Sequence, residues 1–149
     1  MKQLKFLLVC AIIFSACNQS TDKTADNGQT GQEQNQDTAL SLNNGAKWRA
    51  DSITNHNVVR LKTTADMFKV EPFPSINNYQ VLGNDLSNDV DTLLQQCKMK
   101  GDDHTALHKW LEPILGLSNQ LKNETDTAAA KQVFKSVDAR IDAYRNYFE

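Results

Sequence analysis

The sequence has 149 residues, of which 18 are acidic and 16 are basic. This length allows one ordinary domain and excludes a large multidomain enzyme. With 40% hydrophobic and 23% charged residues, the chain is too apolar to be disordered throughout and too polar for a multispan membrane protein. The net charge of -2 and the lack of a dense Lys/Arg run argue against nucleic acid as a partner, because cationic contacts to phosphates supply most of that affinity.

Residues 1–16 have the features of an export signal. Lys2 and Lys5 precede the apolar run 6–14, which is too short to cross a bilayer as a stable helix. The run leads into Ser-Ala-Cys, ending at Cys17, and small residues before a cysteine resemble the lipobox of bacterial lipoproteins, whose cysteine is acylated. We therefore expect lipid attachment at Cys17 and a membrane-anchored protein of the cell envelope, facing the periplasm or the cell surface. An ordinary secretory signal and an uncleaved anchor are the alternatives.

A flexible tether is expected over residues 17–40. From 18 to 39 the sequence is mostly Gln, Asn, Asp, Thr and Gly, without aromatic or branched aliphatic residues, so it cannot bury enough surface to become ordered. A coil of this length spans roughly 25 Å, which would hold a domain clear of lipid headgroups. The globular domain is therefore expected over residues 41–149, with Trp48 packed on its end.

Two amphipathic helices are predicted in the first half of this domain. Apolar residues spaced by three and four predict one helix at about 52–69, which Pro72 and Pro74 end. A second helix at about 75–99 has the strongest periodic pattern in the chain, and Gly101 marks its end. The side chains expected to face the core from these helices are Val58, Leu61, Ala65, Phe68, Tyr79, Leu82, Leu86, Val90, Leu93 and Cys97.

Two further helices complete the predicted fold. Asp102 or Asp103 is expected to cap the third, and Pro113 should kink or restart it because proline removes a backbone donor. The fourth is expected to follow residues 123–126 and to reach the C-terminus. The expected inward side chains are His104, Leu107, His108, Leu111 and Leu115, then Ala130, Val133, Val137, Ile141, Tyr144 and Phe148. Four such helices with short links predict an all-α fold, an antiparallel four-helix bundle.

Metal-ligating residue types cluster where the second predicted helix meets the third. Once the signal is removed and Cys17 is lipidated, Cys97 is the only thiol left in the domain. The pattern C-x-M-x4-H-x3-H follows from it, and histidines four apart share one face of a helix. The sequence therefore predicts that four ligands converge at this corner, namely Cys97, Met99, His104 and His108.

Copper is the metal that this ligand set favours. Thiolate and thioether are soft ligands and imidazole suits copper, whereas zinc, the second choice, would use Cys97, His104, His108 and a water. Thr105 stands where an H-E-x-x-H zinc protease has its glutamate, and neither haem nor nucleotide is expected, because the chain has no C-x-x-C-H and no phosphate loop. We therefore expect a metal carrier, buffer or sensor in preference to an enzyme, and we assign no catalytic residue.

Other interpretations of the cluster stay open at this point. Cysteine is one of the most buried residue types, so these side chains could simply fill the core and cap helices. Cys97 could also form a dimer or act with His104 as a thiol catalyst. A different class of function is an envelope adaptor or accessory subunit that binds a protein partner through the bundle surface without metal.

Two blocks of sequence resemble small exported lipoproteins of Bacteroidetes that have no assigned activity. The first is Leu-Asn-Asn-Gly-Ala-Lys-Trp at residues 42–48. The second and more specific block has Cys-Lys-Met-Lys-Gly at 97–101, His104, and Leu-His-Lys-Trp-Leu at 107–111. The resemblance extends over about residues 42–121 and implies a helical cell-envelope protein in which the Cys, Met and His positions are shared. It implies no substrate.

Overall fold

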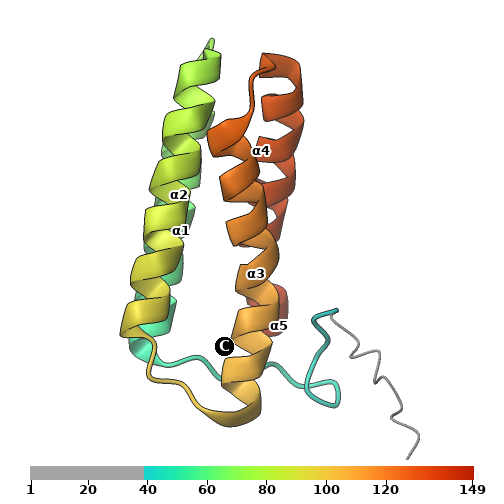
Figure 1. The fold of residues 1–149 in the computed structure, drawn as a ribbon. Helices are drawn as coiled ribbons and strands as arrows, with labels where there is room; N and C mark the ends of the chain where they lie inside the picture. The colour runs from blue at the N-terminus through green and yellow to red at the C-terminus, as the bar shows by residue number, and fades with distance from the viewer. Residues whose placement is uncertain (1–38) are drawn as a thin grey trace, which may run out of the picture. The chain divides into compact units, whose positions relative to one another are not determined.

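The computed structural model describes residues 39–149, so the predicted signal, the lipidated Cys17 and nearly all of the predicted tether lie outside the described residues. The described part folds as an antiparallel four-helix bundle with a short fifth helix (Figure 1). This confirms the predicted all-α class. None of its helices is long and apolar enough to cross a membrane. The helices are α1 (Ser52–Lys69), α2 (Ile76–Gln96), α3 (Gly101–Asn123), α4 (Thr127–Asp142) and α5 (Tyr144–Tyr147).

Side-chain caps fix the starts of three helices. The Asp51 carboxylate accepts a hydrogen bond of 2.7 Å from the Thr54 N–H at the start of α1. Ser75 and Asn78 form a capping box at the start of α2, and Asp126 caps α4. Such caps satisfy backbone donors that have no partner inside the helix, which explains why these helices begin where they do.

The start of α3 corrects the sequence prediction. Its N-cap is Lys100, which makes no capping bond, so neither Asp102 nor Asp103 caps the helix. Both aspartates lie in its first turn, where a negative charge is stabilised by the positive end of the helix dipole. Asp103 instead accepts a hydrogen bond of 3.0 Å from the Arg49 backbone N–H. The sequence predicted an aspartate cap here because it does not reveal that Asp103 accepts from a residue as distant as Arg49.

Pro113 does not restart the third helix. Residues 101–123 form one α-helix with Pro113 inside it. Proline removes the N–H that would bond the carbonyl four residues earlier, that of Lys109. Arg140 of α4 donates to that carbonyl at 2.9 Å and to the Trp110 carbonyl at 3.4 Å. The helix therefore continues because a neighbouring side chain supplies the missing donor.

The buried core follows the predicted stripes of α1, α2 and α4 closely. Every inward residue predicted for the fourth helix is buried, and of those predicted for the first two helices only Phe68 and Cys97 are half-buried rather than buried. The stripe of α3 differs from the prediction. Its buried residues are Ala106, Leu107, Trp110, Leu111, Ile114, Ser118 and Leu121.

The C-terminal end also departs from the prediction of one unbroken helix. α4 ends at Asp142, and the short α5 leads into the extended residue Phe148, which pairs with Trp48. The Trp48 N–H donates to the Tyr147 carbonyl at 2.8 Å, and the Glu149 N–H donates to the Trp48 carbonyl at 3.0 Å. Trp48 is half-buried against the core, as predicted.

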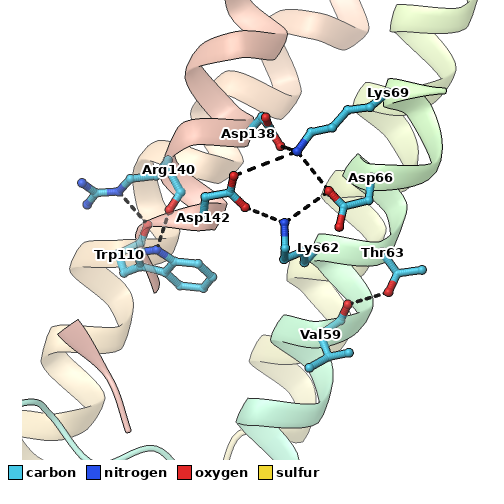
Figure 2. Close-up of polar contacts among 9 residues, drawn as sticks. All are labelled: Val59, Lys62, Thr63, Asp66, Lys69, Trp110, Asp138, Arg140 and Asp142. Carbon is cyan, nitrogen blue, oxygen red and sulfur yellow. Dashed lines mark hydrogen bonds and ion pairs between the residues drawn. The ribbon is translucent and has the colours of Figure 1, made fainter. Parts of the chain in front are cut away.

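Charged side chains join α1 to α4. Figure 2 shows Lys62, Asp66 and Lys69 of α1 facing Asp138 and Asp142 of α4. The Nζ atoms of Lys62 and Lys69 lie 2.6 Å from carboxylate oxygens of Asp142 and Asp138, respectively. Exposed ion pairs contribute little individually, so this network sets the register of α1 on α4 more than it stabilises the bundle.

Candidate functional site

The candidate ligands lie around the link between α2 and α3. α2 ends at Gln96, and the extended Cys97 donates its N–H to the Leu93 carbonyl at 2.9 Å. At the other end of the link, Gly101 has φ of +65°, a conformation that side chains with a Cβ rarely adopt. The second helix is therefore shorter than predicted, and residues 97–100 form a separate extended segment that includes Met99.

Asp51, the residue before α1, holds this link through a hydrogen bond. One carboxylate oxygen caps α1, and the other accepts a hydrogen bond of 3.2 Å from the Lys98 N–H. Partial burial opposes ionisation of Asp51, but hydrogen bonds from Thr54 and Lys98 outweigh it and lower its pKa. The same charged group thus fixes the start of α1 and the position of the link.

Cys97 and Met99 are both half-buried and pack against the core. Cys97 is the one free cysteine in residues 39–149. No group of three or more His, Cys, Asp or Glu side chains in this range is arranged to hold a metal ion. The structure therefore does not gather the Cys97 thiol and both imidazoles into one ready three-ligand set.

The two histidines do come together. The Nε2 atoms of His104 and His108 are 3.0 Å apart, and their ring centroids are 4.5 Å apart with the planes at 70°. His104 is half-exposed and His108 is exposed, so the prediction that both lie on the inward stripe is wrong. The stripe is centred on Trp110 instead, because burying the large indole stabilises the core more than burying an imidazole.

The spacing of the two Nε2 atoms suits coordination of one metal ion. Metal–imidazole bonds are about 2.0 to 2.1 Å long, so two nitrogens at right angles on one ion are about 2.9 Å apart, and about 3.3 Å apart at a tetrahedral angle. The observed 3.0 Å lies between these values. In the metal-free state the same spacing is a hydrogen bond, in which one neutral ring donates and the other accepts.

An apolar recess of about 200 Å³ borders His108. His108 and Glu112 line it from α3, and its apolar lining consists of Val90, Leu94, Leu111 and Leu115. Glu112 lies one further turn along the face that carries the two histidines. Sequence reasoning missed Glu112, although the spacing H-x3-H-x3-E would have shown it.

The third histidine of the chain and Trp110 do not belong to the candidate site. His56 is exposed on α1. Trp110 is fully buried, and its Nε1 donates to the Arg140 carbonyl at 2.9 Å. Trp110 therefore packs in the core and does not line the candidate site.

Comparisons with known proteins give no family for this chain. No family model, no curated protein and no solved structure matches it. The resemblance to Bacteroidetes lipoproteins therefore stays a prediction. The geometry around His104 and His108 is the strongest guide to function.

Proposed function

We propose that the protein is a lipid-anchored cell-envelope domain that binds a transition metal, copper in preference to zinc, as a carrier, buffer or sensor. The observation that carries this proposal is the imidazole pair of His104 and His108, with Nε2 atoms 3.0 Å apart on the exposed side of α3. The two imidazoles already lie side by side, which lowers the entropic cost of ordering them around an ion, and the proton between the Nε2 atoms has to be lost or move to Nδ1 when both bind.

The sulfur side chains support copper. Cys97 and Met99 lie in the link that directly precedes the helix of the histidines. Both sulfur side chains are half-buried against the core, so each would have to turn out of that packing to bind an ion held by the imidazoles. Thiolate and thioether prefer Cu(I), whereas the two nitrogens at 3.0 Å suit the near-right angles of Cu(II). The proposal therefore expects Cu(I) to depend on sulfur and Cu(II) to depend mainly on the imidazoles.

Metal titration of the reduced full chain tests the proposal. We expect one equivalent of copper, bound more tightly than zinc, and weakened at least about tenfold by either His104→Ala or His108→Ala. His56→Ala is the matched control, since it also removes a solvent-exposed imidazole from a helix. Cys97→Ser should weaken Cu(I) binding far more than Cu(II) binding.

Two outcomes would reject parts of this model. Equal copper affinity in the His104→Ala and His56→Ala variants would remove the imidazole pair from the site. Unchanged Cu(I) affinity in Cys97→Ser would remove the thiolate and leave a site of two nitrogens. Affinity should also fall as the pH is lowered, because protons compete with the metal for imidazole and thiolate.

The lipid anchor needs a separate test, because it rests on residues outside the described part. Cells expressing the full chain should incorporate labelled fatty acid into it. Cys17→Ser should abolish this label and release the protein from the membrane fraction, whereas Cys10→Ser should retain it. Labelling of Cys17→Ser would refute attachment at this residue.

A second candidate function, an envelope adaptor that binds a protein partner, is favoured by a different observation. Exposed apolar side chains concentrate on α1, α2 and the connection between them. Large exposed apolar side chains in one region indicate an interaction site more often than scattered ones do.

A further inference from the structure

The exposed apolar side chains of the bundle are unevenly distributed. Of the six large hydrophobic residues exposed in residues 39–149, five lie between residues 59 and 81. Phe73, in the connection between α1 and α2, is 91% exposed, and Met67 on α1 is 70% exposed. Burial of such side chains by a partner would be favourable by the hydrophobic effect. This region is therefore the best candidate interaction surface of the described chain.

A groove of about 590 Å³ runs between α1 and α2 in the same region. Its lining combines exposed apolar side chains with charged and amide groups. Met67 borders it from α1 and Val81 borders it from α2. The lining residues are Arg60, Thr64, Met67, Phe68, Glu71, Asn78, Val81, Leu82, Asp85, Asn88 and Asp89.

The charges in the groove do not balance. Its one cation, Arg60, is already paired with the buried Asp89, whose carboxylate oxygens also accept a hydrogen bond of 2.6 Å from the Thr64 hydroxyl. Glu71 and Asp85 are exposed and have no ion-pair partner among residues 39–149. The groove therefore presents two uncompensated carboxylates beside apolar side chains.

We propose that this groove binds an amphipathic helix of a partner protein, one whose apolar stripe is flanked by Lys or Arg. The apolar stripe would cover Met67 and Val81, and the flanking cations would approach Glu71 and Asp85. Helix-in-groove recognition uses apolar anchors at helical spacing, and methionine at a binding surface adapts to them. Glu71 lies in the connection before α2, and Asp85 lies nine residues, or about 14 Å, beyond the start of α2, so the two carboxylates come from different parts of the groove. The proposal deepens the adaptor candidate and is independent of the metal site.

A synthetic peptide provides the probe. The peptide, about 18 residues of Leu, Ala and Lys, carries its leucines on one helical face with lysines on both flanks. A second peptide has glutamate in place of every lysine. Binding of each fluorescent peptide to the full chain in phosphatidylcholine nanodiscs is followed by anisotropy. We expect micromolar binding of the lysine peptide and at least about tenfold weaker binding of the glutamate peptide.

Matched variants locate the binding surface. Asp85→Lys should weaken the lysine peptide at least about fivefold, whereas Asp91→Lys, an identical charge change at an exposed α2 position outside the groove, should change it less than about twofold. Met67→Ser should weaken binding, and Leu42→Ser, which replaces an exposed apolar residue outside both the groove and the 59–81 region, should not.

Several results would overturn the proposal. Absence of lysine-peptide binding would do so, as would equal effects of Asp85→Lys and Asp91→Lys, which would indicate a general charge effect. If the groove variants instead change binding of the protein to phosphatidylglycerol vesicles, the groove recognises a lipid surface and not a helix. His104→Ala should leave peptide binding intact, so loss of the metal function and loss of the groove function are separately visible.

Discussion

Arg140 replaces a backbone donor that Pro113 takes away from α3, and a double-mutant cycle tests this role. Its guanidinium donates to the carbonyls of Lys109 and Trp110 at 2.9 and 3.4 Å, and Figure 2 shows it beside Trp110. Hydrogen bonds from a charged donor contribute about 1.5 to 3 kcal/mol, and Arg140 is only half-buried, so Arg140→Ala should lower the free energy of unfolding by about 1.5 kcal/mol.

The cost should shrink when the proline is absent. In Pro113→Ala the new N–H can bond the Lys109 carbonyl, so Arg140→Ala should then cost only about 0.5 kcal/mol, a coupling of about 1 kcal/mol. Urea unfolding of the four proteins, followed by circular dichroism, measures this coupling. Arg140→Lys controls for the charge, since it keeps the cation but loses the fork of donors. Equal costs of Arg140→Ala in both backgrounds would refute the compensating role.

Three further predictions follow from other parts of the bundle. Gly83→Ala should destabilise the protein by about 1 to 3 kcal/mol, because an added Cβ would lie 2.5 and 2.7 Å from backbone atoms of α3. Gly116→Ala, with open space at that position, should stabilise it by up to about 1 kcal/mol, so the same sign for both changes would contradict this reasoning. Hydrogen bonds from Lys69 and Lys62 lower the pKa of Asp66. The contribution of the Asp66 carboxylate to the free energy of unfolding should therefore be lost as the pH falls below about 4, and an Asp66→Asn variant should lose less stability over this pH range. Burial raises the pKa of Tyr144 to about 12, so stability should fall as the pH rises above about 10, and Tyr144→Phe should flatten that fall in alkaline unfolding curves.

Helix periodicity predicted most of the fold. α1 has the predicted bounds, and the predicted stripe of α4 is buried in full, since each has one clear apolar face. The apolar pattern of α3 was ambiguous, because two overlapping faces of this helix carry apolar residues. One face has Leu107, Leu111 and Leu115, and the other has Trp110 and Ile114. Tertiary packing selected the face with the indole, which local spacing alone does not determine.

Contacts between distant residues were beyond the reach of the sequence pattern. The bond from Lys98 to Asp51 joins residues 47 apart, and the bond from Arg140 to Lys109 joins residues 31 apart. Neither gives a periodic signal, although each determines the path of the chain near the candidate site. The sequence did predict that His104 and His108 lie side by side, because residues four apart share one face of a helix.

The two proposed sites lie toward opposite ends of the described bundle, and residues 40 and 41 lie at the end that holds the histidine pair. Leu40 and Ser41 lie against the first turns of α3, beside Asp102 and Thr105, and the Ser41 carbonyl accepts a hydrogen bond of 2.7 Å from Trp48 Nε1. The chain thus enters at the end that holds the histidine pair.

Antiparallel topology places the connection with Phe73 at the other end (Figure 1). Under the two proposals, metal and the partner helix would therefore bind at separate places on the bundle.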